Sequence, residues 1–427
     1  MTHFAIICPA VTGHLNPMFA LGRELQRRGH RVTFIGVLDA QATTLAAGLE
    51  FRVIAESEYP LGAIPKLSAQ LGELSGFAAL RYAFRNFQQQ LNAALLRDAP
   101  AAIKEAGVEA LLVDQVIPVR GTLAEFLDIP LIEVCNALIE NPDDTIPPLF
   151  TTWSYNPAWW ARLRNRAANL VFSRITGPIE EVNEQYRQQW KLPPHSSSNK
   201  RFSPLAIVSQ QPAEFEFPRQ TLPDYFHFTG PYHDSTGRVP VDFPYEKLTG
   251  QPLIYASMGT LQNRQQKVFQ HIAEACVGLD AQLVISLGGS ASPESLQGLP
   301  GNPLVVGYAP QLELLKKATL TITHAGLNTT LECLTDGVPI VAIPIAFDQL
   351  GNAARIAWTG AGEFVPLSRL SVPRLRGAIQ RVLTQESYKK NATRLQEAIR
   401  QAGGVSRAAD IIEQAISTGK PALAQAR

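Results

Sequence analysis

Short, continuously apolar runs alternating with helix-like stretches constrain this chain more than any other feature of its sequence. In the first half they are residues 4–10, "RVTFIGV", "FRVIAES", "EALLVDQVI" and "PLIEV". The alternation restarts at "LIYASMGT" and continues through "AQLVISLGG", "PLVVGYAP", "ATLTITHAG" and "PIVAIP". Strands of this kind occur where helices cover both faces of a parallel sheet. We therefore predict an α/β fold with two Rossmann-like parallel-sheet domains.

A stretch rich in proline, glycine and turn residues, 219–252, separates the two halves and has the composition of an interdomain linker. We predict an N-terminal domain over residues 1–225, a linker over 226–250 and a second domain over 251–405. A C-terminal helix and tail over 406–427 are expected to pack back toward the first domain. The final "STGKPALAQAR" is expected to fray.

Composition excludes several classes of function. The 427 residues carry a formal charge of +1 without a basic cluster, so nucleic acid is not an expected partner. The four cysteines are scattered, which argues against a disulfide framework and a zinc site. The first residues lack a signal-peptide pattern, and no run approaches the roughly 18 apolar residues of a spanning helix. We expect a cytoplasmic protein.

Small and polar residues follow three strands of the second half. They are Ser257, Gly259 and Thr260 after "LIYA", residues 307–311 after "PLVV", and residues 324–330 after "LTIT". Ligands of open parallel sheets bind in the crevice outside the carboxyl ends of the strands. A helix that begins there offers unpaired N–H groups and a partial positive charge, which suit phosphate oxygens.

The stretch "HAGLNTTLE" offers donors for a diphosphate in His324, Asn328 and Thr329, and Gly326 permits close approach of the backbone. Glu332, about one turn inside the helix, could accept the two hydroxyls of a ribose. A purely structural alternative is a helix capped by Thr329 or Thr330 with Glu332 in its first turn. This segment alone leaves the two interpretations open.

Two neighbouring segments favour the nucleotide interpretation. Tyr308 offers a face on which a base can stack, and the backbone of residues 309–311, including Ala309 and Gln311, can meet the edge of that base. Asp348 and Gln349 follow another strand end, and adjacent carboxylate and amide groups can bracket sugar hydroxyls.

Taken in order, "YAPQ", "THAGLNTTLE" and "DGVPIVAIPIAFDQLGNA" resemble the nucleotide-sugar signature of the UDP-glycosyltransferase family, and "GHLNP" and "ASMGT" support the match. The resemblance covers nearly the whole chain and is strongest with bacterial carotenoid and macrolide glycosyltransferases. It implies the GT-B fold, in which two Rossmann-like domains face a central cleft. It implies no cofactor and no metal, with a UDP-hexose as co-substrate. The positions it assigns to the donor are Gly13, Ser257, Gly259, Thr260, Tyr308, Ala309, Gln311, His324, Gly326, Asn328, Thr329, Glu332, Asp348 and Gln349.

Leu327 departs from the pattern of the family. Many plant relatives have Trp where this chain has Leu327, so one contact to the sugar or phosphate is expected to be missing.

His14 follows the first strand, and its imidazole can accept a proton at neutral pH. Asp114 ends another strand, and its carboxylate could orient that imidazole. The resemblance places the general base and its orienting acid at these two positions.

We therefore predict an inverting glycosyltransferase. His14 would deprotonate an acceptor hydroxyl, which attacks the anomeric carbon of a UDP-α-sugar. UDP is expected over dTDP because Glu332 favours a 2′-hydroxyl, and analogy with the family suggests glucose. The aromatic spans 77–96 and 150–172 cover the sheet and could also wall a pocket for a hydrophobic acceptor such as a carotenoid, terpenoid, polyketide or flavonoid. A lipophilic acceptor would involve transient membrane contact.

Other interpretations remain open at this point. A nicotinamide-dependent oxidoreductase has similar domains, but the first turn holds Gly13 alone where that class has G-x-G-x-x-G. A non-catalytic sugar-nucleotide-binding protein would not need His14 and Asp114, and an epimerase of the same fold would need no acceptor. "NPDDT" at residues 141–145 is predicted to be a solvated turn rather than a metal motif.

Overall fold

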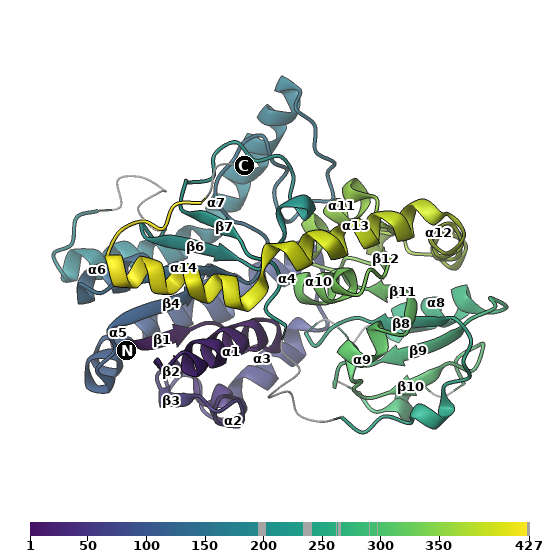
Figure 1. The fold of residues 1–427 in the computed structure, drawn as a ribbon, viewed down its shortest axis with the longest axis horizontal. Helices are drawn as coiled ribbons and strands as arrows, with labels where there is room; N and C mark the ends of the chain where they lie inside the picture. Colours follow the sequence, from purple (N-terminus) through teal and green to yellow (C-terminus); the bar gives the residue numbers. More distant parts are fainter. Residues whose placement is uncertain are drawn as a thin grey trace.

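The fold is built on two parallel sheets, one in each domain (Figure 1). The computed structural model describes residues 1–194, 202–233, 241–261, 263, 266–289, 291–296 and 298–424. The first sheet has seven strands in the order β3-β2-β1-β4-β5-β6-β7. Its strands are β1 (His3–Ile7), β2 (Arg31–Gly36), β3 (Glu50–Val53), β4 (Ala110–Asp114), β5 (Leu131–Cys135), β6 (Ala206–Ser209) and β7 (Phe226–Phe228).

The second sheet has six strands in the order β10-β9-β8-β11-β12-β13. In both sheets the first strand lies in the interior; the next two strands are added on one side of it and the later strands on the other, so the strand order reverses beside the first strand. That reversal leaves a crevice at the carboxyl ends of the central strands, where ligands bind in this architecture. The strands are β8 (Leu253–Ser257), β9 (Gln282–Ser286), β10 (Leu304–Val306), β11 (Ala318–Thr323), β12 (Ile340–Ala342) and β13 (Gly362–Phe364).

Helices cover both faces of each sheet, as the buried apolar strands require. In the first domain α1 and α14 cover one face and α5 and α6 the other; in the second, α10 and α13 lie opposite α8 and α12. The helices of the first half are α1 (Thr12–Arg27), α2 (Gln41–Ala46), α3 (Ala63–Leu71), α4 (Gly76–Ala83), α5 (Gln89–Ala106), α6 (Arg120–Leu127) and α7 (Trp159–Gln189). Those of the second half are α8 (Gln266–Cys276), α9 (Gln311–Leu315), α10 (Leu327–Thr335), α11 (Gln349–Thr359), α12 (Val372–Thr384), α13 (Glu386–Ala402) and α14 (Gly404–Thr418).

The chain ends by crossing back to the first domain. Gly403 and Gly404 have φ values of 91° and 61°, a left-handed turn that glycine adopts without steric cost, and they separate α13 from α14. The two helices lie along both domains in yellow in Figure 1. Ile411 and Ile412 of α14 are buried in the first core, and each contributes about 1.5–3 kcal/mol by leaving water. The C-terminal helix therefore packs on the first domain.

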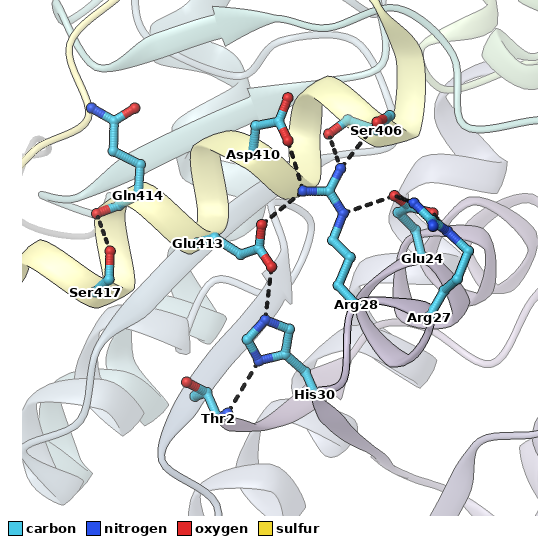
Figure 2. Close-up of polar contacts among 10 residues, drawn as sticks. All are labelled: Thr2, Glu24, Arg27, Arg28, His30, Ser406, Asp410, Glu413, Gln414 and Ser417. Atoms are coloured by element: carbon cyan, nitrogen blue, oxygen red, sulfur yellow. Dashed lines mark hydrogen bonds and ion pairs between the residues drawn. The ribbon is translucent and has the colours of Figure 1, made fainter.

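Charged residues fix α14 to the end of α1 and the turn after it (Figure 2). Arg28 donates to Asp410 and Glu413 over 2.6 and 2.7 Å, and His30 lies 2.9 Å from the second oxygen of Glu413. The tail continues the attachment, since the N–H of Ala422 donates to the carbonyl of Leu205 over 2.8 Å. The expectation that the tail frays is therefore wrong for its described part, residues 417–424.

Two further boundaries differ from the sequence-based expectation. β7 pairs with β6, so the first sheet extends three residues into the predicted linker, which began at residue 226. The helical stretch 77–96 is not one regular helix, because a π-helical segment, Phe84–Gln88, joins α4 to α5. Among the described residues no helix is long and apolar enough to cross a membrane.

Candidate active site

The pairing of β1 with β4 brings together the two residues predicted to act on the acceptor. Ile7 pairs with Val113, so the turn into α1 lies beside the end of β4. His14 is in the first turn of α1 and Asp114 is the last residue of β4. Nδ1 of His14 lies 2.7 Å from Oδ2 of Asp114, so the proton that this hydrogen bond requires is on Nδ1 and Nε2 is left as the basic nitrogen.

Asp114 is fully buried and held by several donors. Asn136 donates to its Oδ2 over 2.8 Å and the N–H of Val116 donates to its Oδ1 over 3.1 Å. The His14 side chain keeps 21% of its surface exposed and can be reached by a substrate. Burial disfavours the imidazolium, but the charge and hydrogen bond of Asp114 outweigh it and raise the pKa of His14, with smaller contributions from Asp348 and Glu140. The site therefore stabilises the imidazolium that forms when His14, acting as a general base, accepts a proton.

The turn from β11 into α10 carries the residues predicted to hold a diphosphate. Ala325, in this turn, is buried with φ of 64°, a conformation that costs a non-glycine residue about 1–2 kcal/mol. Strain of this kind concentrates at functional sites. The helix begins at Leu327 with Gly326 as its N-cap and no capping side chain. The alternative in which Thr329 or Thr330 caps the helix is wrong, and Glu332 lies in the second turn.

His324 lies between two glycines of neighbouring turns. A Cβ placed on Gly259 or on Gly326 would come within 2.5 Å of Nε2 of His324, so both positions require the absence of a side chain. Gly259 also has φ of 73°. Burial lowers the pKa of His324 to about 4, so the imidazole is neutral at pH 7 and can donate a single hydrogen bond.

The predicted nucleoside residues lie together. Gln311 donates a short hydrogen bond to Oε2 of Glu332, and the hydroxyl of Tyr255 donates to Oε1 of Gln311 over 3.1 Å. Glu332 is only 3% exposed, whereas Tyr308 is 44% exposed and presents a face for stacking. His233 was not predicted from the sequence; its Nδ1 lies 3.9 Å from Oε1 of Glu332 and thus borders the same carboxylate.

Asn328 joins the two domains. Its Nδ2 donates a short hydrogen bond to the carbonyl of Gly13, and its Oδ1 accepts from Gln210 over 2.7 Å. The resemblance implied that Asn328 holds the diphosphate; in the structure both polar ends of its side chain bind the first domain. Gln210 was not predicted. Through Gly13, this contact places the start of α10 next to the turn that carries His14.

Asp348 and Gln349 lie at the start of α11, opposite the first domain. Oδ2 of Asp348 accepts from the backbone N–H of Leu138 over 3.3 Å, and burial raises the pKa of this carboxyl group. Oε1 of Gln349 accepts from the N–H groups of Ile345 and Ala346 over 3.0 and 3.1 Å, so its carbonyl organises the preceding loop. Phe347, just before them, has a left-handed φ of 55°.

Three further positions of the predicted donor site are Ser257, Thr260 and Leu327. Ser257 is buried and its hydroxyl accepts from the N–H of Gly259 over 3.4 Å, while Thr260 is half-buried at the same strand end. Leu327 packs in the core of the second domain, so its side chain does not face the crevice.

The acidic turn 141–145 differs from its prediction as a solvated turn. Asp143 is buried and accepts from Thr145 and from the N–H of Gln220. No group of three or more potential metal-binding side chains occurs in the part of the chain that the structure describes.

Comparison with known proteins decides which family this geometry represents. The profile of the family "UDP-glucoronosyl and UDP-glucosyl transferase" matches residues 75–402, and the profile "Glycosyltransferase family 28 N-terminal domain" matches residues 11–109. The chain belongs to the UDP-glucoronosyl and UDP-glucosyl transferase family. This glycosyltransferase is 32% identical to the zeaxanthin glucosyltransferase of Pantoea ananas over 99% of its own length and 98% of that protein's. It is 27% identical to the demethyllactenocin mycarosyltransferase of Streptomyces fradiae, over 98% and 87%.

Solved structures agree with the GT-B architecture of this glycosyltransferase. The glycosyltransferase of kitacinnamycin superposes with a TM-score of 0.74 at 22% identity and covers 97% of this chain and 99% of its own. The glycosyltransferase SsfS6 of Streptomyces sp. SF2575, complexed with thymidine diphosphate, gives 0.66 at 19% identity, over 97% and 100%. The family confirms the prediction of a transferase over an oxidoreductase or a non-catalytic binding protein.

Proposed function

We propose that this glycosyltransferase moves glucose from UDP-glucose to a hydroxyl group of a hydrophobic small molecule, with inversion at the anomeric carbon. The observation that carries the proposal is the pair of His14 and Asp114 at 2.7 Å, set beside the start of α10 by the contact between Gly13 and Asn328. A basic nitrogen and a phosphate-binding helix end thereby meet at one crevice.

The reaction is a single displacement. Nε2 of His14 takes the proton of the acceptor hydroxyl as its oxygen forms a bond to the anomeric carbon and the bond from that carbon to the diphosphate oxygen breaks. Asp114 stabilises the resulting imidazolium, and UDP leaves with the electron pair of the broken bond. Attack from the face opposite the leaving group turns an α-linked donor into a β-glycoside.

The leaving diphosphate needs compensation of its negative charge. The first N–H groups of α10 carry partial positive charge, and Thr329 and neutral His324 can add hydrogen bonds. We propose that these groups make a divalent cation unnecessary. Activity should therefore persist after EDTA treatment, and activity restored only by added magnesium would refute this part.

The donor is proposed to be a ribonucleotide sugar. Glu332 can accept two hydroxyls of a ribose, and a deoxyribose lacks one of them. The thymidine diphosphate bound to SsfS6 shows that a chain of this fold can take the other nucleotide, so the choice rests on Glu332. Glucose is supported by the glucosyltransferase relative and by Asp348 and Gln349 at the crevice.

The acceptor is proposed to be a natural product with a large apolar part. The ring of Phe172 lies 4.8 Å from that of Phe150 and 5.7 Å from that of Phe84 between centroids, and the three rings form an apolar surface in the first domain. The relatives are named for zeaxanthin and demethyllactenocin, which supports a carotenoid or polyketide alcohol.

The test is a product screen by mass spectrometry with UDP-glucose and a panel of carotenoid, terpenoid, polyketide and flavonoid alcohols. The proposal predicts a product heavier by one hexose with a β linkage. Conversion of the sugar nucleotide without an acceptor would instead identify an epimerase. An α-linked product would contradict the displacement mechanism.

A further inference from the structure

The first two thirds of α7 carry apolar side chains on their outer face. Trp159 is 74% exposed and Leu163 55% exposed. Helical spacing aligns Trp159, Leu163 and Leu170 in one stripe, and the buried Ala161 and Asn165 lie on the opposite side. Trp160 and Val171 are also about half exposed and flank the stripe. These five exposed residues, Trp159, Trp160, Leu163, Leu170 and Val171, are called the α7 patch.

The same part of α7 is strongly basic. Arg162, Arg164, Arg166 and Arg174 lie between residues 159 and 179, where the sequence has no Asp or Glu. Two of the four are engaged locally: the guanidinium of Arg164 stacks 4.2 Å from the ring of Trp153, and Arg166 pairs with Asp144 at 2.9 Å. Arg162 and Arg174 are exposed. Acidic residues begin only at Glu180, so charge divides the helix into a basic part and an acidic part.

A hollow of about 260 Å³ opens within this surface. Trp159 and Leu163 line it together with Arg162, Arg166 and Asp144. One indole ring, one leucine side chain, two guanidinium groups and one carboxylate therefore border the same space. A surface that offers tryptophan, leucine and arginine together matches the boundary of a bilayer, where acyl chains lie beneath charged headgroups.

The α7 patch and the apolar surface assigned to the acceptor lie on opposite sides of the same helix. Phe172 lies on the same side of α7 as Ala161 and Asn165, where it stacks on Phe150 at 4.8 Å and meets Phe84 edge-on at 5.7 Å. Figure 1 shows α7 rising from the body of the first domain toward the top of the view. A bilayer that contacted the patch would be separated from the aromatic residues of the acceptor region by α7 alone.

We propose that the α7 patch docks on the surface of an anionic lipid bilayer, with Trp159, Trp160 and Leu163 inserted at the headgroup level. Arg162 and Arg174 meet the negative headgroups, each contributing attraction to the anionic surface. The proposal rests on the proposed function and deepens it, because it brings the enzyme to the bilayer in which a lipophilic acceptor dissolves. Membrane attachment itself needs neither donor nor acceptor.

The test is sedimentation of the full-length protein with vesicles of phosphatidylcholine alone or mixed with phosphatidylglycerol, in the absence of any substrate. We expect binding to the mixed vesicles, weak binding to phosphatidylcholine, and release by salt. The partition coefficient should fall about fivefold for each of R162Q and R174Q. W159A/L163A should reduce binding at least tenfold, since each side chain removes about 1.5–3 kcal/mol of apolar transfer.

Matched controls are R400Q on α13 and L45A on α2, which remove an exposed arginine and an exposed leucine from other surfaces. Both should bind vesicles as the wild type does, and all variants should keep the thermal midpoint of the wild type. No binding to anionic vesicles, or equal loss in variants and controls, would overturn the proposal. So would self-association that W159A/L163A abolishes without any vesicle binding, because the patch would then be an interface between two copies. Glycosylation of a water-soluble acceptor by vesicle-negative variants would leave the proposed function standing.

Discussion

Replacement of Asp114 by Asn removes one charge while nearly preserving shape, and so isolates the role of this carboxylate. The two oxygens of Asp114 accept from Nδ1 of His14, from Asn136 and from the N–H of Val116. An amide has one oxygen and one NH₂ group, so it cannot accept at both places. Either the NH₂ faces the N–H of Val116, or it faces His14 and favours the tautomer whose Nε2 carries the proton. In that second tautomer His14 cannot accept a proton from the acceptor.

The expected loss of catalytic rate in D114N is large. General base catalysis contributes roughly 10²–10⁴-fold, and the analogous Asp-to-Asn change in a serine-protease triad lowers kcat about 10⁴-fold. We expect D114N to lower kcat by about 10²–10⁴. Asp114 raises the pKa of His14, and the base acts only when neutral, so wild-type activity falls as pH drops through that raised pKa. Loss of the charge lowers the pKa, so the acid limb of D114N should lie at lower pH.

The assay is the pH profile of kcat and kcat/KM with UDP-glucose and the best acceptor of the product screen. UDP affinity, measured by calorimetry, should stay within a few-fold of the wild type because Asp114 lies in the first domain. D280N, an exposed change in the second domain, is the matched control and should leave the profile unchanged. A D114N enzyme with the wild-type plateau and the same acid limb would refute the role assigned to the pair.

Three further predictions concern the donor site and the domain interface. E332A should lower kcat/KM for UDP-glucose about 10- to 100-fold, because hydrogen bonds to a charged group are worth about 1.5–3 kcal/mol; equal losses for UDP- and dTDP-glucose in a donor comparison would contradict the ribose assignment. G326A should weaken UDP binding in calorimetry, since its Cβ would lie 2.5 Å from Nε2 of His324, and unchanged affinity would show that the imidazole position is unimportant. G351A should destabilise the protein by about 1–3 kcal/mol, because its Cβ would lie 2.6 Å from the carbonyl of Leu149 across the interface. A thermal midpoint equal to that of the wild type would argue against this close contact.

The sequence predicted the sheets well where strands are long, apolar and fully buried. β1 and β4 read as continuous apolar runs because helices cover them on both sides. β13 has only the three residues Gly362–Phe364 with a glycine at its start, and it gave no comparable signal. β7 lies in a segment whose prolines and glycines indicated a linker, and only its pairing with β6 makes it a strand.

The candidate site was predictable where function depends on residues near one strand end. The turn containing His324 and the turn containing Asp348 both follow strands, so their side chains were expected at the crevice. Asn136, Gln210 and His233 come from other segments and lie near the site only through tertiary packing, so no local pattern indicated them. The start of α10 was misplaced in the capping alternative, because the left-handed conformation of Ala325 lets the helix begin before the two threonines.

The contact between Asn328 and Gly13 also depends on tertiary packing, which no local sequence pattern indicates. The residue type and position of Asn328 indicated a hydrogen-bonding role, but not its partners in the other domain. The choice of UDP-glucose, the absence of a metal requirement and a cytoplasmic location stay predictions.

The central claim is that His14 is the general base of a glycosyl transfer, and one measurement on H14A tests it most directly. UDP release in the presence of acceptor should fall at least 10²-fold, since general base catalysis supplies roughly that much. UDP-glucose affinity of the same variant, measured by calorimetry, should match the wild type because the donor positions other than Gly13 lie in the second domain. Turnover of H14A at the wild-type rate, with donor affinity unchanged, would contradict the account.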